Sequence, residues 1–156
     1  LAIVENAVEA LTDMATAHRI QLDLDGEEDV WVRGNAELLE RAVINLLSNA
    51  IQYSPSDSAV EIRVERLASS GGTLAQVSIR DHGPGIPPQE LPRLFRRFHR
   101  QRLDEMQGRK GAGLGLSFVK VVTDKHGGQI DVASQPGEGS TFRLRLPVET
   151  TTGHSP

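Results

Sequence analysis

The sequence predicts an α/β (α+β) fold, a two-layer α/β sandwich in which a mixed, mostly antiparallel sheet carries three helices on one face. Two observations predict it. Segments with apolar residues at helical spacing alternate with short segments in which apolar and polar residues alternate. The 156 residues also suit one core, since domains have about 100 to 150 residues. We expect one domain over 1–148 and a frayed tail over 149–156.

The first third of the chain predicts a helix, two short strands and a long central helix. Apolar side chains at three-and-four spacing over 1–17 indicate the first helix. Alternation over 20–24 and the run 30–32 predict two strands that pair with each other across an acidic turn. Asn35 is a typical helix N-cap, and the apolar stripe after it predicts a helix that Pro55 ends.

The rest of the chain continues this alternation. Four segments have the pattern of strands and predict two hairpins, 60–64 with 77–79 and 130–133 with 141–146. Two helices are predicted between them, over 89–98 and 114–125. The polar, charged segment 100–113 ends in glycines, which predicts a mobile loop.

Composition excludes several classes of function. The net charge of −4 disfavours a nucleic-acid partner. The chain has no cysteine, so it has no disulfide or thiolate metal site, which fits a reducing compartment and favours the cytoplasm. No apolar run approaches the ~20 residues that cross a bilayer, so we expect no membrane contact. Leu1 is not an initiator methionine, and we expect a fragment of a longer protein, which can itself be membrane-anchored.

Two asparagines lie four residues apart on the central helix, and so on one helical face. Asn45 and Asn49 are flanked by apolar positions and are followed by Tyr53. Surface or capping asparagines are one interpretation. The functional alternative is ligation of Mg²⁺ by amide oxygens, because Mg²⁺ takes few protein oxygens and keeps phosphates and waters.

A second candidate site follows the strand that ends near Ile79. Residues 81–85 read Asp-His-Gly-Pro-Gly, which is also the composition of an ordinary turn. Gly83 and Gly85 would let backbone approach a flat ligand closely, and an ionised Asp81 offers only acceptors, which suits the amino group of a purine.

A third candidate is the glycine-rich run 111–116, at the start of a helix. Helix-start N–H groups attract phosphate. A dinucleotide-binding fingerprint would follow the first strand of a βαβ unit, and this run follows a charged loop late in the chain. A Walker motif would need Gly-Lys-Ser or Gly-Lys-Thr at the required spacing, which is absent.

Between the last two motifs lies a cationic stretch. A charge run is usually a solvated face, but here glycine motifs flank it. Phe95 and Phe98 at helical spacing could anchor the base of a lid, while cations such as Arg97 and Arg100 neutralise a triphosphate.

The order of these motifs resembles the N box, first glycine box, F box and second glycine box of sensor histidine kinases. The matching segments are 45–50, 81–85, 95–98 and 111–116, and 137–142 is similar to the closing G-x-G-[ST]-x-F of that family. The resemblance covers nearly the whole chain. It implies the Bergerat ATP-binding fold, shared with type II topoisomerases, mismatch-repair ATPases and a heat-shock chaperone.

The resemblance also implies roles for residues. Asn49 would ligate Mg²⁺, Asn45 would support the metal and phosphates, and Asp81 would bind the adenine amino group. The further residues that it assigns to ATP are Gln52, Tyr53, Gly83, Gly85, Ile86, Arg97, Arg100, Gly111, Gly113, Leu114, Gly115, Leu116 and Thr141. Gln52 departs from the family, which commonly has Lys or Arg there, and this weakens a phosphate contact.

None of the histidines precedes an acidic residue as the acceptor of this family does. The resemblance therefore implies a monomeric domain that binds ATP or ADP and phosphorylates a histidine on a separate dimerisation hairpin of the parent protein, which signals to a response regulator. A degenerate nucleotide sensor without kinase activity is one alternative. A related ATPase or serine kinase is another, although such proteins carry a carboxylate base where this helix has Asn45.

Overall fold

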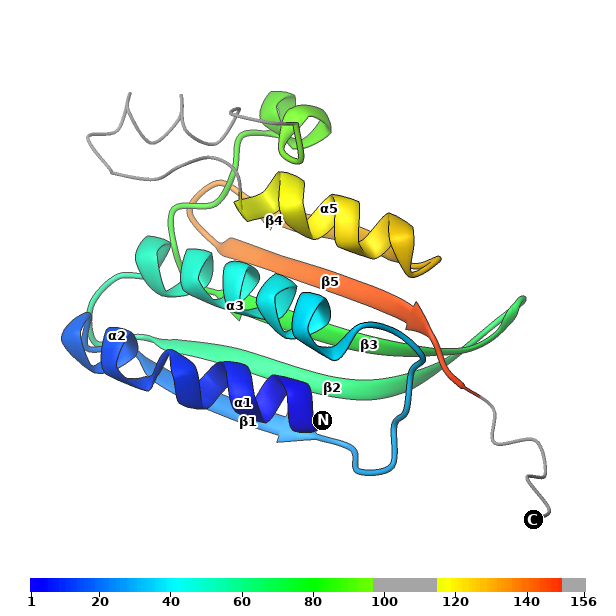
Figure 1. The fold of residues 1–156 in the computed structure, drawn as a ribbon. Coiled ribbons are helices and arrows are strands. Elements are labelled where there is room, and N and C mark those ends of the chain that lie inside the picture. Colours follow the sequence, from blue (N-terminus) through cyan, green and yellow to red (C-terminus); the bar gives the residue numbers. More distant parts are fainter. Residues whose placement is uncertain (97–114, 150–156) are drawn as a thin grey trace, which may run out of the picture.

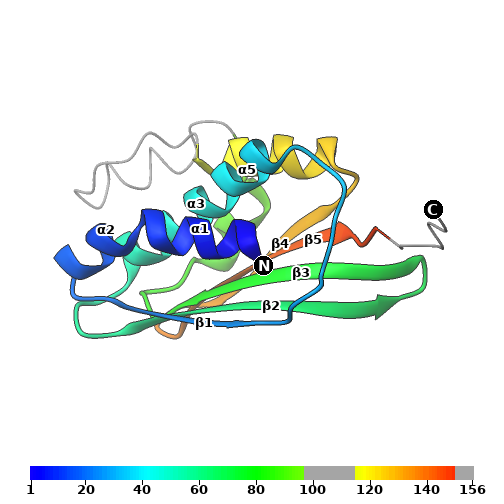
Figure 2. The same ribbon diagram turned by 60° about the horizontal axis from the view of Figure 1, so that its bottom comes forward.

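The computed structural model describes residues 1–96 and 115–149. It has two layers, a five-stranded sheet and a layer of helices on one face (Figures 1 and 2). The predicted fold class is therefore confirmed. The strand order is β1-β2-β3-β5-β4, with bounds β1 (Gln21–Gly26), β2 (Ala59–Ser69), β3 (Gly72–Asp81), β4 (Gln129–Gln135) and β5 (Gly139–Pro147).

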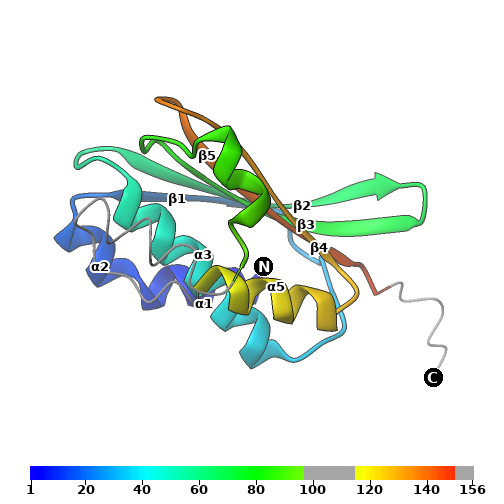
Figure 3. The ribbon, with the colours of Figure 1, turned by 90° about the horizontal axis from the view of Figure 1, so that it is seen from above.

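Four α-helices of the described residues form the second layer, namely α1 (Ala2–Ala10), α2 (Thr12–Ala17), α3 (Ala36–Tyr53) and α5 (Gly115–Lys125). Figure 3 shows α1, α3 and α5 side by side beneath the sheet. The expected single helix over 1–17 is broken at Leu11. The hydroxyl of Thr12 donates to the carbonyl oxygen of Val8 at 2.9 Å, a back-bond that bends helices.

The two predicted hairpins form, because β2 pairs antiparallel with β3 and β4 pairs antiparallel with β5. The predicted strand over 30–32 was wrong. Strand β1 pairs instead in parallel with β2, from Gln21 opposite Ala59 to Gly26 opposite Val64. The chain turns at Asp29, whose φ is +60°, and Trp31 remains 65% exposed.

The predicted helix over 89–98 was also wrong in type and length. The described part is a 3-10 helix, η1 (Pro88–Arg93), and Pro92 lies inside it. Proline removes a hydrogen bond and its ring collides with the carbonyl of an earlier turn of an α-helix, so a regular α-helix is disfavoured here. Phe98 lies outside the described residues.

Helix α3 lies at the centre of the core. It begins where predicted, because Asn35 Oδ1 accepts a hydrogen bond from the backbone N–H of Leu38 at 3.0 Å. Its apolar stripe, including Leu46, Leu47 and Ile51, is fully buried between the sheet and the neighbouring helices. Helix packing thus fixes which face of α3 remains for polar residues.

No helix of the described residues covers the other face of the sheet (Figure 2). Charged side chains of β4 and β5 pair with each other there. Arg145 forms an ion pair with Asp131 and donates from Nε to Gln76 Oε1 at 2.8 Å. Gln76 Nε2 in turn donates to Glu65 Oε1 at 3.1 Å. These cross-strand contacts satisfy long side chains on a sheet face that is open to water.

No helix in the ranges 1–96 and 115–149 has the length and apolar character needed to cross a membrane.

Candidate functional site

The last turn of α3 and the ends of two strands meet at one narrow pocket. Its lining residues come from α3, from the end of β3 with the loop after it, and from β5: Asn49, Tyr53, Asp81, Pro84, Gly85, Ile86, Ser140 and Phe142. The predicted N box and first glycine box, more than thirty residues apart in the sequence, thus open into one cavity. The cavity volume is about 10 Å³, so a ligand larger than a water molecule requires its side chains to move.

The two asparagines of α3 lie on the face directed at α5. Asn45 and Asn49 are both half-buried, one turn apart. Asn45 Nδ2 donates to the carbonyl oxygen of Gly115, the first residue of α5, at 3.4 Å. A carbonyl can only accept, so the amide nitrogen faces α5 and the amide oxygen of Asn45 points elsewhere. This contact joins the N box to the described end of the second glycine box.

Asp81 is the last residue of β3 and is only 5% exposed. Its Oδ1 accepts a hydrogen bond from the backbone N–H of Gly83 at 2.9 Å, which fixes the carboxylate at the pocket wall. A Cβ on Gly83 would lie 2.3 Å from the carbonyl oxygen of Tyr53. The loop after β3 therefore packs directly on the end of α3, and only glycine fits at position 83.

The same loop is tied to the turn between β4 and β5. The carbonyl oxygen of Pro84 accepts from the N–H of Gly137 at 2.7 Å, and the N–H of Ile86 donates to Ser134 Oγ at 2.8 Å. Gly85 has φ +78°, and a Cβ there would lie 2.2 Å from the carbonyl oxygen of Gln135. Helix α3, strand β4 and the turn between β4 and β5 thus hold the loop beside the pocket.

Thr141 is not at this pocket. In the register of β3 and β5, Thr141 lies opposite Arg80, and it lines a separate open groove that Ser140 also borders. Ser140 lies opposite Asp81 and lines the pocket. Sequence reasoning missed Ser140, although the pattern G-x-G-[ST]-x-F puts position 140, and not 141, at its hydroxyl residue.

The other predicted residues divide into three groups. Gln52 is exposed on α3, and the Leu116 side chain is 1% exposed in the core, so only its backbone could contact a ligand. Phe95 packs edge-on against Phe142, a lining residue of the pocket, with ring centroids 6.3 Å apart. The remaining ones lie outside the described residues: Arg97, Arg100, Gly111, Gly113 and Leu114.

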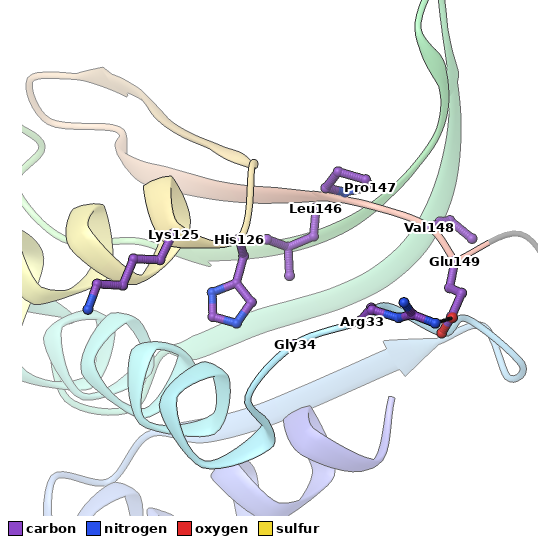
Figure 4. A pocket seen from close by; sticks show the side chains of 8 residues that line it. All are labelled: Arg33, Gly34, Lys125, His126, Leu146, Pro147, Val148 and Glu149. Atoms are coloured by element: carbon purple, nitrogen blue, oxygen red, sulfur yellow. Dashed lines mark hydrogen bonds and ion pairs between the residues drawn. The ribbon is translucent and has the colours of Figure 1, made fainter.

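A larger hollow of about 610 Å³ lies at the opposite ends of α3 and α5 and contains none of the predicted site residues (Figure 4). Arg33 reaches Glu149 there, with Nη2 and Oε1 2.7 Å apart. The His126 ring bridges the two helices, because Nδ1 lies 2.7 Å from the Val122 carbonyl oxygen and Nε2 lies 3.0 Å from the Asn35 nitrogen. This hollow is wide open, and its polar groups are largely paired with one another.

The described residues thus form a two-layer α/β sandwich with a pocket where α3 and β3 end and β5 begins. The model of the histidine kinase-, DNA gyrase B- and HSP90-like ATPases matches residues 34–150, and the chain belongs to that family. Its relatives are sensor histidine kinases. It is 35% identical over 147 residues to sensor histidine kinase RppB of Synechocystis sp., and 39% identical over 146 residues to sensor-like histidine kinase SenX3 of Mycobacterium tuberculosis.

Each alignment covers 94% of this chain, but only 32% of RppB and 35% of SenX3. The chain therefore spans about a third of the length of these relatives. Among solved structures, the mycobacterial sensor histidine kinase MprB has 33% identity and a TM-score of 0.77, with 94% of this chain and 93% of that chain covered. Full-length ShkA in complex with AMPPNP has a TM-score of 0.79 at 24% identity over 94% of this chain and 29% of that one, and shares the fold.

Proposed function

We propose that this domain binds Mg·ATP in the pocket at the end of α3 and transfers the γ-phosphoryl group to a histidine on a separate helical hairpin of its parent protein. One observation carries the proposal. Asn49, which has the chemistry to hold a metal and phosphates, and Asp81, which has the chemistry to hold an adenine, line one pocket. A match to the sequence motifs alone would not require Asn49 and Asp81 to line the same pocket.

The adenine would bind at the inner end of the pocket. The buried carboxylate of Asp81 would accept from the adenine amino group. Gly83 and Gly85 keep the loop close to α3 and to the β4–β5 turn, so that the backbone approaches the ring. Ile86 and Tyr53 would contact the faces of the ring, and Ser140 would replace Thr141 as the hydroxyl beside its edge.

The phosphates would lie toward the N-terminus of α5. The described residues contain no cluster of three or more acidic or histidine side chains for a metal, so amide oxygens are the ligands that this chain offers near the pocket. Asn49 would ligate Mg²⁺ through its oxygen, and Asn45 would support it while its nitrogen holds Gly115. Mg²⁺, when bound, neutralises charge on the phosphate oxygens.

Phosphoryl transfer needs positioning more than covalent chemistry by the protein. Asn45 stands where related ATPases carry a glutamate, and an amide cannot accept the proton of an attacking water. This favours transfer to an imidazole, which brings its own nucleophilic nitrogen. Backbone and cations of the second glycine box and lid would complete the phosphate site, from Arg97, Arg100, Gly111, Gly113, Leu114, Gly115 and Leu116.

The remaining assignments follow from this function. Residues 1–148 would act as one monomeric unit in the cytoplasm that exchanges ATP and ADP. The partner would be the dimerisation and phosphoacceptor hairpin of the same parent protein, which then passes the phosphoryl group to a response regulator. Exposed Gln52 supports one alternative, a nucleotide sensor without transferase activity, since an amide neutralises no phosphate charge.

Calorimetry of Mg²⁺-dependent ATP binding tests the site. We expect Asp81→Asn and Asn49→Asp to weaken binding at least tenfold, because each changes one partner of a charged or buried contact. Asp23→Asn, an exposed aspartate on β1, is the matched control and should bind like the wild type. Unchanged affinity in both site variants would rule out this pocket as the ATP site.

A second experiment tests transfer. The domain is mixed with the purified hairpin of its parent protein and γ-labelled ATP, and label on the hairpin is followed. We expect transfer that depends on Mg²⁺ and on Asn49. Tight ATP binding without any transfer would instead support the sensor function, and release of free phosphate without a hairpin would support an ATPase.

A further inference from the structure

Three polar side chains form a row across the edge of the sheet where the pocket lies. Ser140 on β5 is opposite Asp81 on β3 and also opposite Ser134 on β4. Ser140 Oγ lies 2.8 Å from Ser134 Oγ. Asp81 and Ser140 line the pocket, whereas Ser134 is behind Ser140 as seen from Asp81.

Either serine of this row could donate to the other, and one of the two arrangements makes every contact of Ser134 Oγ a hydrogen bond. Ser134 Oγ lies 3.0 Å from the carbonyl oxygen of Gly139, which can only accept, so this contact is a hydrogen bond when Ser134 directs its single hydroxyl proton there. The N–H of Ile86 donates to the same Ser134 oxygen at 2.8 Å. In that arrangement Ser134 has no proton left for Ser140, and Ser140 is the donor in the contact between the two hydroxyls.

This assignment fixes what Ser140 offers to the pocket. When its only proton is directed at Ser134, Ser140 offers the pocket lone pairs alone. The neighbouring Asp81 carboxylate, when ionised, is likewise an acceptor. The side chains at this edge of the pocket thus accept from a ligand and do not donate to it.

We propose that Ser134 is a positioning residue that makes the nucleotide pocket selective for 6-aminopurines, by holding the hydroxyl proton of Ser140 away from the ligand. The inference rests on the proposed ATP-binding function. A 6-amino group donates and suits an edge made of acceptors, either directly or through one water. A 6-oxo group is an acceptor and would face the acceptor oxygens of Asp81 and Ser140. Because none of these groups could donate to another, they would remain without hydrogen bonds in the pocket.

The test compares the affinities of the whole domain for ATP and for inosine triphosphate, whose base has a 6-oxo group. The measured quantity is the ratio of the two dissociation constants. In Ser134→Ala the Ser140 proton is free to rotate toward the ligand, and we expect the preference for ATP to fall about tenfold. Ser134→Thr keeps a hydroxyl at the same position and should keep the wild-type ratio.

A purely structural role of Ser134 predicts a different result. Loss of the acceptor for the Ile86 N–H would weaken both nucleotides alike and leave the ratio unchanged. The Ser140→Ala background provides the second control, because no hydroxyl remains to reorient. There, addition of Ser134→Ala should leave the ratio as it is in Ser140→Ala alone.

The outcomes are distinct. An unchanged ratio in Ser134→Ala, or an equal shift with and without Ser140, overturns the inference while ATP binding by the wild type still supports the proposed function. Failure of the wild type to bind ATP overturns both. If Ser134→Ala does not fold, the Ser140→Ala variant alone tests the proposal. We expect it to lower the affinity for ATP more than the affinity for inosine triphosphate. An equal loss of affinity for both nucleotides refutes the proposal.

Discussion

Ser140 lies directly opposite Asp81 in the antiparallel register of β3 and β5, and its neighbour Thr141 lies opposite Arg80 on the other face of the sheet. Successive side chains of a strand point to opposite faces, so only one of the two hydroxyls can enter the pocket at the end of α3. The register selects Ser140. Four predictions follow from this and related contacts.

The first prediction compares the two neighbouring hydroxyls. We expect Ser140→Ala to weaken ATP binding by a factor of about three to ten, because it removes one acceptor at the pocket edge. Thr141→Ala should change the dissociation constant less than about twofold, since its side chain is on the outer face. Isothermal titration of both variants checks this, and the opposite order would show that the register differs when ATP is bound.

The second prediction concerns Gly83. A methyl group there would collide with the Tyr53 carbonyl at the end of α3, so Gly83→Ala should push the loop away from the helix. We expect a loss of about 2 kcal/mol in the free energy of unfolding, measured in urea, together with weaker ATP binding. Gly71→Ala is the control, because a Cβ there meets nothing within 4 Å, and it should change stability by less than about 0.5 kcal/mol.

The third prediction concerns the start of α3. Asn35→Ala removes the acceptor of the Leu38 N–H and should lower the free energy of unfolding by about 1 kcal/mol. Asn35→Ser retains a capping oxygen and should lose much less. Chemical denaturation of the two variants measures the difference. Equal losses would show that this cap contributes nothing beyond the side-chain volume.

The fourth prediction concerns His126. The Val122 carbonyl can only accept and the Asn35 N–H can only donate, so Nδ1 carries the proton and Nε2 is the acceptor. Nitrogen-15 NMR of the ring should show this neutral tautomer. His126→Phe should lower the free energy of unfolding by about 1 kcal/mol, because the Asn35 N–H loses its acceptor.

His18 provides the comparison for His126. It is exposed and has only the Met14 carbonyl near its Nδ1, at 2.9 Å. Replacement of His18 by phenylalanine should therefore change stability by less than about 0.5 kcal/mol. A loss as large as that of His126→Phe would contradict the bridging role.

Much of the fold was predictable from local patterns. The cap at Asn35, the apolar stripe of α3 and the alternation in β2, β3 and β5 all describe single elements, and each of these predictions is confirmed. The wrong predictions concern features that depend on contacts with residues distant in the sequence. Residues 30–32 had the pattern of a strand, yet β2 became the neighbour of β1.

The candidate site also combines features that the sequence predicted with features that depend on distant contacts. The order of the motifs around Asn49 and Asp81 was legible in the sequence, and the structure places both at one pocket. Ser134 was not a candidate, because a lone serine in a strand carries no signal of its own. Its importance comes from the Ser140 hydroxyl and the Ile86 N–H, which reach it from two other segments.

The sequence by itself determined where α3, α5 and the two hairpins form, which of their faces are apolar, and which family of ATPases the chain belongs to, because periodicity and motifs are properties of neighbouring residues. Tertiary structure alone decided that Ser140 pairs with Asp81 across β5 and β3, and that Asn45 contacts Gly115. Strand register and helix packing are set by contacts between residues far apart in the chain, and a shift of one residue would exchange the two faces of a strand.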